Sequence, residues 1–227
     1  MDPAHFDRAA FSGRVPLFPL DKVVLFPNAF LPLHIFEPRY RAMTADALAG
    51  ERLIAMAAFQ PGSEQDAAGN PPLREVVGVG RILEEEKQAD GRYNVILYGV
   101  ARARIVEEVS RDPYRLAKVE LLEDRPEKGR KYGRLRRLLL QFYNEILKKV
   151  LKGASVSPPA DLPLGPLCDL LAALLAFEPP VKQALLEDLD VGARCDRLVS
   201  LLQDSKAPGF GGGKASRRPW PPGPSLN

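Results

Sequence analysis

The sequence predicts an α+β fold, with a curved or pseudo-barrel β-domain of about six strands and one inserted helix, followed by a C-terminal helical subdomain. Up to Leu122 the chain consists of short segments rich in Val, Ile, Leu and Phe, separated by turn residues, which is typical of a strongly curved sheet. After Leu122 apolar residues recur at every third or fourth position, which is typical of helices. The chain has 227 residues and 45% hydrophobic content, which suffices for a core without disulfides.

The stretch from Val15 to Arg41 is expected to supply the first strands and the inserted helix. Its prolines cannot donate a ladder hydrogen bond, so we expect the strands here to lie at edges or bends. From Pro38 onward the pattern becomes helical, and Gly50 lies just past the expected end of that helix. The segments with strand character are residues 15–20, 23–26 and 30–36.

The remainder of the predicted sheet follows in residues 51–122. A buried strand is expected at 51–59, followed by a surface loop at 60–72. In the next strand, Gly78 and Gly80 permit a close backbone approach or a bulge. After an Asp90-Gly91 hairpin turn, further strands are expected at residues 93–99, 101–109 and 114–122.

Helical signals continue to residue 203. An apolar stripe predicts a helix over 132–150, and a second helix begins near Asp161 and Pro163 and is stopped by Glu178-Pro179-Pro180. Two more are expected at 181–189 and 191–203, the last capped by Asp190. We therefore divide the chain into a flexible leader (1–13), a β-domain (14–122), a helical subdomain (123–203) and a disordered, basic Pro/Gly-rich tail (204–227).

Two blocks of the sequence resemble a known family. The run PLFPLDKVVLFPNAFLPLHIFEPRYRAM closely resembles the start of the Lon N-terminal domain. A second block keeps the order of the family's motifs, although Ala103 replaces the usual aromatic residue; these motifs are Val77–Ile82, Asp90–Tyr93, Leu97–Gly99, Arg102–Ile105 and Asp112–Tyr114. The resemblance covers about residues 14–203 and is strongest to small bacterial proteins that carry this domain without the ATPase and peptidase domains.

The resemblance implies a function in polypeptide binding, because in Lon this region helps to recognise unfolded or degron-bearing polypeptides. We therefore expect a non-catalytic protein that binds polypeptide segments or partner proteins and is linked to protein quality control. Binding would use apolar side chains in a groove between sheet and helices, with strand addition at a sheet edge. The candidate contacts are Phe30, Leu31, His34, Phe36, Arg39 and Tyr40.

The residues themselves show no catalytic set, and no cofactor is expected. Residues 209–216 imitate a phosphate loop, but Pro208 and Ala215 stand where the motif needs Gly and Ser or Thr. The serines lie mostly in turns, loops or the tail, and none occupies a nucleophile elbow. His34 has no Ser or Cys beside it and is expected to be a partly buried structural residue rather than a general base. The alternative is a peptidase with an unrecognised active site.

Three charged groups have both a structural and a functional interpretation. The run Glu84–Glu86 is expected to be a solvated hairpin end rather than a metal site. The charged residues at the helix start are expected to form a structural clamp rather than to contact a ligand; they are Glu37, Arg39 and Arg41. The basic residues between 128 and 152 favour a solvated helix face; the alternative is an RNA- or ribosome-associated factor acting through this helix.

Charge and cysteine content indicate the compartment and exclude some partners. The net charge of +3 is only mildly basic, so we expect no nucleic-acid partner. Cys168 and Cys195 fit neither a disulfide framework nor a zinc site, which favours free buried thiols in a reducing compartment. The N-terminus lacks the apolar core of a secretory signal, and no apolar segment is long enough to span a membrane. We therefore expect a cytoplasmic protein without a membrane partner; its oligomeric state stays open.

Overall fold

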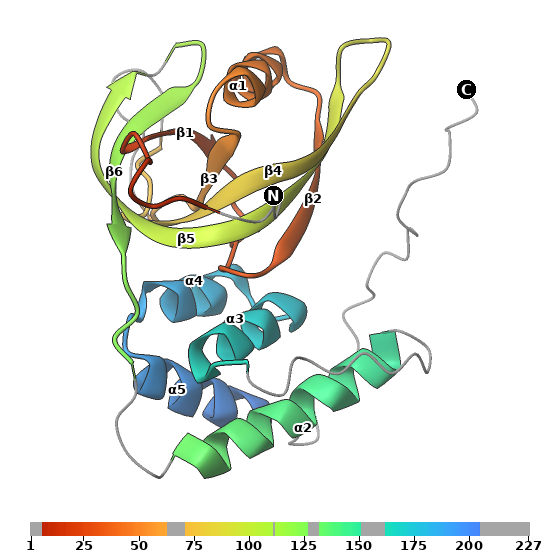
Figure 1. Ribbon diagram of the computed structural model, residues 1–227, viewed down its shortest axis with the longest axis vertical. Helices are drawn as coiled ribbons and strands as arrows, with labels where there is room; N and C mark the ends of the chain where they lie inside the picture. The colour runs from red at the N-terminus through yellow and green to blue at the C-terminus, as the bar shows by residue number, and fades with distance from the viewer. Residues whose placement is uncertain (1–5, 63–70, 111, 127–131, 151–161, 205–227) are drawn as a thin grey trace.

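A computed structural model describes residues 6–62, 71–110, 112–126, 132–150 and 162–204 (Figure 1). These parts of the chain form a mixed six-stranded sheet and five helices, so the predicted α+β class is confirmed. The strands are β1 (Arg14–Pro19), β2 (Phe30–Ile35), β3 (Leu53–Ala57), β4 (Val76–Lys87), β5 (Tyr93–Ser110) and β6 (Arg115–Leu122). The helices are α1 (Pro38–Ala49), α2 (Tyr132–Val150), α3 (Leu164–Leu174), α4 (Pro179–Glu187) and α5 (Val191–Asp204).

The sheet closes on itself through the long strand β5. The strand order is β2-β5-β4-β3-β1-β6, and β6 also pairs with β5. On one edge of β5, residues 93–98 pair with β2 and residues 102–110 pair with β6. Strands β1, β3, β4, β5 and β6 therefore form a closed ring, and β2 extends the sheet beside the first part of β5. The two strands predicted at 93–99 and 101–109 are thus one 18-residue strand.

The segment between β1 and β2 crosses the sheet as irregular chain, so the strand predicted at 23–26 is wrong. Its backbone lies directly on two glycines of the sheet: a Cβ atom on Gly78 would overlap the carbonyl oxygen of Leu25, and one on Gly99 that of Phe26. This crossing confirms the close approach predicted at Gly78. It also explains why Gly99 lies within β5 and does not end it: the missing side chain leaves room for the crossing backbone and does not mark a turn.

Helices α2 to α5 pack together beneath the barrel (Figure 1). Asp190 caps α5 as predicted, because its carboxylate accepts a hydrogen bond of 2.9 Å from the backbone N–H of Ala193. The predicted ends of α3 are wrong. This helix begins after Pro163, which is its N-cap, and ends at Leu174, while Pro179 and Pro180 form the first turn of α4. None of the described helices is long and apolar enough to cross a membrane.

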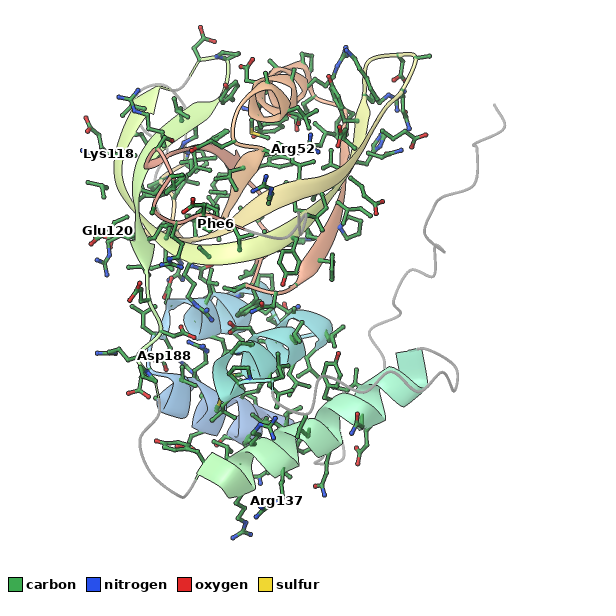
Figure 2. All side chains as sticks on the ribbon, viewed as in Figure 1. Phe6, Arg52, Lys118, Glu120, Arg137 and Asp188 are labelled. Atoms are coloured by element: carbon green, nitrogen blue, oxygen red, sulfur yellow. The ribbon has the colours of Figure 1, made fainter. Side chains whose placement is uncertain are left out.

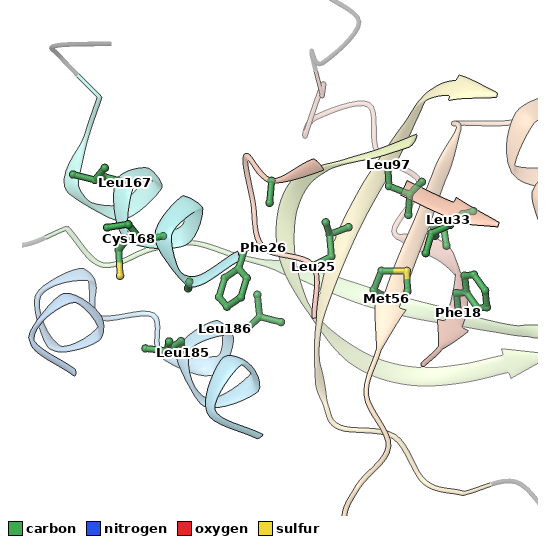
Figure 3. Close-up of a cluster of buried hydrophobic side chains, with 14 of the residues drawn as sticks. Phe18, Leu25, Phe26, Leu33, Met56, Leu97, Leu167, Cys168, Leu185 and Leu186 are labelled. Carbon is green, nitrogen blue, oxygen red and sulfur yellow. The ribbon is translucent and has the colours of Figure 1, made fainter. Parts of the chain in front are cut away.

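One buried apolar cluster runs from the barrel into the helices (Figure 3). A smaller cluster fills the other part of the barrel, and Phe6 and Phe11 pack against it. The predicted leader, tail and domain boundaries stay predictions. Residues 1–5 of the leader and 205–227 of the tail lie outside the described residues, as does Asp161, near which α3 was expected to begin. The continuous cluster includes Phe18, Leu25, Phe26, Leu33, Met56 and Leu97 from the barrel side and Leu167, Cys168, Leu185 and Leu186 from the helices.

Candidate functional site

Strand β2 forms an edge of the sheet and carries three of the six predicted contact residues, with a fourth, Phe36, directly after its end. Among the described elements only β5 runs alongside it. Side chains alternate between the two faces of a strand, and Leu33 and Ile35 are buried on the inner face. Phe30 is 65% exposed and Phe36, just after the strand, is 59% exposed on the outer face, together with the exposed His34. The edge therefore presents two aromatic rings to solvent.

Neighbouring strands hold these outer side chains in place. The rings of Phe30 and Tyr98 have their centroids 5.1 Å apart, and His34 stacks on Phe36 with a centroid distance of 6.2 Å. Asn94 lies between β2 and β4: its amide nitrogen donates to Glu86 at 3.0 Å, and its amide oxygen lies 2.8 Å from His34 Nδ1. Since that oxygen can only accept, His34 Nδ1 is the donor. His34 is thus an exposed, oriented side chain, and the prediction that it is partly buried is wrong.

The backbone of β2 shows which groups face away from the sheet. The carbonyl of Ala29 accepts a hydrogen bond from the N–H of Gly99, so odd-numbered residues direct their backbone groups toward β5. Even-numbered residues direct theirs toward the free edge. Pro32 fits this alternation, because its missing N–H then costs no ladder bond with β5. The N–H and C=O groups of Phe30 and His34 and the carbonyl of Pro32 therefore point outward in the plane of the sheet.

The other predicted contacts lie apart from this surface. Tyr40 is buried against Phe18, with ring centroids 4.4 Å apart, and burial raises the pKa of its hydroxyl. Leu31 is half-buried and packs against the core. Arg39 lies over the Tyr40 ring, 4.5 Å from its centroid, and pairs with Glu37 at 3.0 Å. The structure thus brings Phe30, His34 and Phe36 together and places Tyr40 in the core.

The acidic run Glu84–Glu86 is exposed in the distal part of β4. Glu85 pairs with Arg52 at 2.5 Å, and Glu86 accepts the hydrogen bond from Asn94. In the parts of the chain that the structure describes, no group of three potential ligands could hold a metal ion. These glutamates therefore contribute to strand contacts and solvation at the hairpin.

The basic helix α2 uses one of its arginines structurally. The guanidinium group of Arg136 donates to the carbonyl of Leu162 at 3.1 and 3.2 Å. Arg134 is exposed, and Arg137 projects away from the other helices (Figure 2). Several other basic positions of this region, including Lys128, Arg130, Lys131 and Lys152, lie outside the described residues.

A buried ionic network, which no sequence motif predicted, joins the barrel to the helices. Arg102 of β5 donates to both carboxylate oxygens of Asp169 in α3, at 2.9 and 2.5 Å. Arg194 of α5 donates to both oxygens of Asp124, at 3.0 and 2.5 Å, and its Nε lies 3.3 Å from Asp169. The side chains of Arg102, Asp169 and Arg194 are 4%, 2% and 0% exposed. One signal was available, because Asp169 interrupts the apolar pattern of its helix.

The network is electrically balanced, with two positive and two negative groups. Burial raises the pKa of Asp169, and the guanidinium groups of Arg102 and Arg194 oppose that rise. Burial also disfavours the charge on Arg194, but hydrogen bonding to Asp124 and the charge of Asp169 outweigh it and raise the pKa of Arg194. Backbone carbonyls of Leu186 and Asp188 accept further hydrogen bonds from the two arginines, at 2.9 and 2.6 Å. Because each charged group has charged partners within the network, we interpret it as a structural connection.

A cleft of about 390 Å³ lies beside this network, between barrel and helices. Its lining includes the charged side chains of Arg8, Arg102, Asp124 and Asp169. None of the six candidate contact residues lines it. Charged and apolar residues line this cleft together, and the exposed aromatic residues lie elsewhere, on the β2 edge.

The fold is thus a small barrel, closed through one long strand and joined to a layer of helices by a common core. The family model of the ATP-dependent protease La (LON) substrate-binding domain matches residues 14–204. The chain belongs to this family, as the resemblance predicted.

Known proteins agree with this assignment. The chain is 29% identical over 197 residues to Lon protease 2 of Myxococcus xanthus and 30% identical over 191 residues to a Lon protease of Syntrophomonas wolfei. Each match covers 83% of this chain but only 23% of the relative, so the chain spans about a quarter of their length.

Two solved structures share the fold. A Lon N-terminal domain protein from Xanthomonas campestris has a TM-score of 0.61 at 23% identity, covering 82% of this chain and 97% of that one. The N-terminal domain of a Mycobacterium avium complex Lon protease has a TM-score of 0.56 at 21% identity, covering 84% and 98%.

Proposed function

We propose that this chain is a non-catalytic module that binds extended polypeptide segments by adding them as a strand to the free edge of β2. The observation that carries this proposal is the combination on one edge of outward backbone groups and two exposed aromatic rings, Phe30 and Phe36. Membership of the Lon substrate-binding family supports the same class of ligand. Unfolded or degron-bearing polypeptides, or a partner protein with an exposed strand, would fit this edge.

Strand addition explains how such a site accepts many sequences. Backbone hydrogen bonds with Phe30, Pro32 and His34 would be independent of the ligand's side chains. Alternate ligand side chains would lie on the outer face, next to the rings of Phe30 and Phe36, and would supply the selectivity for apolar segments. Tyr98 and His34 hold these rings in place, so ligand binding needs little additional ordering of the site.

We place this function in the cytoplasm, within protein quality control. Cys168 and Cys195 are buried free thiols, which suits a reducing compartment. A contact with the Cys168 thiol, together with burial, raises the pKa of Cys195, which disfavours its reactive thiolate form. Within this proposal residues 14–122 form the binding domain and residues 123–203 the supporting helical subdomain.

Binding of a labelled, permanently unfolded polypeptide tests the proposal. We expect saturable binding, and Phe30→Ser combined with Phe36→Ser should weaken it roughly tenfold or more, because exposed aromatic anchors dominate such interfaces. The matched control is Val106→Ser with Val109→Ser, two other exposed apolar positions. The absence of saturable binding at high micromolar concentration would contradict the proposed ligand. Cleavage of the polypeptide by the pure protein, with or without ATP, would contradict the non-catalytic assignment.

A further inference from the structure

The β2 edge carries a self-complementary pattern. Phe30 and Phe36 lie three residues on either side of Leu33, and both rings are exposed on the same outer face. Pro32 and His34 lie one residue on either side. Phe30, Pro32 and His34 have even numbers within β2, so their backbone groups face the free edge, and Phe36 follows directly after the strand. A strand of this kind can pair with a copy of itself that runs in the opposite direction.

We propose that two copies of this chain pair antiparallel through their β2 edges, with the two-fold axis passing beside Leu33. In this register Phe30 lies opposite the second copy's Phe36 and exchanges both backbone hydrogen bonds with it. His34 donates its N–H to the carbonyl of the second copy's Pro32. The symmetry repeats each contact, so both exposed rings of each copy gain an aromatic cross-strand partner.

The positions of the proline and the aromatic residues select this register. A shift that places Pro32 opposite the second copy's Pro32 would leave the centre of the ladder without an N–H donor, because proline has none. The opposite shift would place Phe36 opposite Pro32 and leave Phe30 without an aromatic partner. Only the register centred at Leu33 brings each exposed phenylalanine opposite the other while keeping a donor on both sides of the axis.

The size of the interface indicates a reversible dimer. A phenylalanine can bury about 150–250 Å². Four rings that are 65% and 59% exposed in each free copy would therefore contribute at most roughly 400–600 Å². That area is below the range of stable interfaces, so we expect a dissociation constant on the order of tens of micromolar. This pairing does not depend on the proposed polypeptide binding, although both use the same edge and would compete.

Sedimentation equilibrium of the full chain without polypeptide tests the proposal. We expect the wild type to change from monomer to dimer across the micromolar range. Two charged variants, Phe30→Lys with Phe36→Lys and Phe30→Glu with Phe36→Glu, should each stay monomeric, because like charges would face each other. Both positions are exposed, so circular dichroism should show unchanged folding. The control Val106→Lys with Val109→Lys should dimerise like the wild type.

Mixing the two charged variants tests the register. Each lysine would then face a glutamate of the other variant, so a heterodimer should form although neither variant pairs with itself. A wild type that is monomeric at several hundred micromolar would overturn the proposal. So would charged variants that still dimerise, or a mixture that forms no heterodimer. Polypeptide binding is measured with this chain held dilute, below the concentration at which copies pair, and with the polypeptide titrated up to high micromolar concentration. The failure of one proposal is then distinguishable from the failure of the other.

Discussion

Replacing Arg102 by methionine should destabilise the protein far more than the same replacement two residues further along β5. Arg102 is 4% exposed and donates to both oxygens of Asp169, so Arg102→Met leaves a buried carboxylate with Arg194 as its remaining close cation. Removing one partner of a buried ion pair costs about 3–5 kcal/mol, because the other charge stays out of water. That is a large fraction of the roughly 5–15 kcal/mol that stabilises a typical native protein.

Arg104 provides the matched control. It lies on the same strand and pairs with Glu120 at 3.7 Å, but the two side chains are 47% and 66% exposed. Exposed pairs contribute about 0–1 kcal/mol, so Arg104→Met should be nearly neutral. Urea unfolding followed by circular dichroism would measure both variants. At a slope of about 2–3 kcal/mol per molar urea, the midpoint should fall by roughly 1–2 M for Arg102→Met.

A second variant separates the lost charge balance from lost packing. Combining Arg102→Met with Asp169→Leu removes one charge of each sign and leaves the Arg194–Asp124 pair intact. Since replacing a whole buried pair by apolar side chains is often neutral, the double variant should recover much of the lost stability. Equal midpoints for Arg102→Met and Arg104→Met would refute this reasoning. A double variant less stable than Arg102→Met alone would refute the electrostatic explanation.

Three further predictions concern single contacts. Gly99→Ala should lower the free energy of unfolding by about 1–3 kcal/mol in thermal unfolding, because its methyl group would overlap the Phe26 carbonyl. Gly133→Ala, with open space around it in α2, should be neutral or stabilising by up to about 1 kcal/mol. Asp190→Ala should cost about 1 kcal/mol in urea unfolding through loss of the α5 cap; no measurable change would contradict the capping bond. Burial and the hydrogen bond to Asp46 raise the pKa of Tyr114 from 10.0 to about 12. The stability that Tyr114 contributes should therefore be complete below pH 10 and be lost as the pH rises through 12. Ultraviolet titration against Tyr114→Phe measures that pKa, which Asp46→Asn should lower.

Local signals in the sequence predicted the elements that depend on local chemistry. Pro38 begins α1 and Asp190 caps α5, because these preferences are set within one turn of helix. The strand predicted at residues 23–26 failed because strand propensity is also satisfied by a buried irregular segment. The crossing is determined by Gly78 and Gly99, more than fifty residues away in the sequence, which no local pattern could show.

The candidate site was predictable in part for the same reason. The prolines of this stretch indicated strands at edges or bends, and Phe30 and Phe36 were among the expected contacts, but the structure is what places both rings on one face. The burial of Tyr40 depends on how α1 packs against β1 and β3, which the sequence does not specify. The ionic network draws its members from β5, the connection after β6, α3 and α5, so only the unusual position of Asp169 pointed to it.

The proline in β2 has a consequence for anything that pairs with this edge. An exposed edge strand is an aggregation hazard, and proline is one of the residues that limit it. Because Pro32 offers a carbonyl but no N–H, an added strand finds a gap in the ladder at the middle of β2. Affinity must then come from the two ends of the strand, where Phe30 and Phe36 lie. The spacing of the two rings therefore favours partners with apolar side chains at both ends of a short extended segment, and it disfavours the long uninterrupted pairing that leads to aggregation.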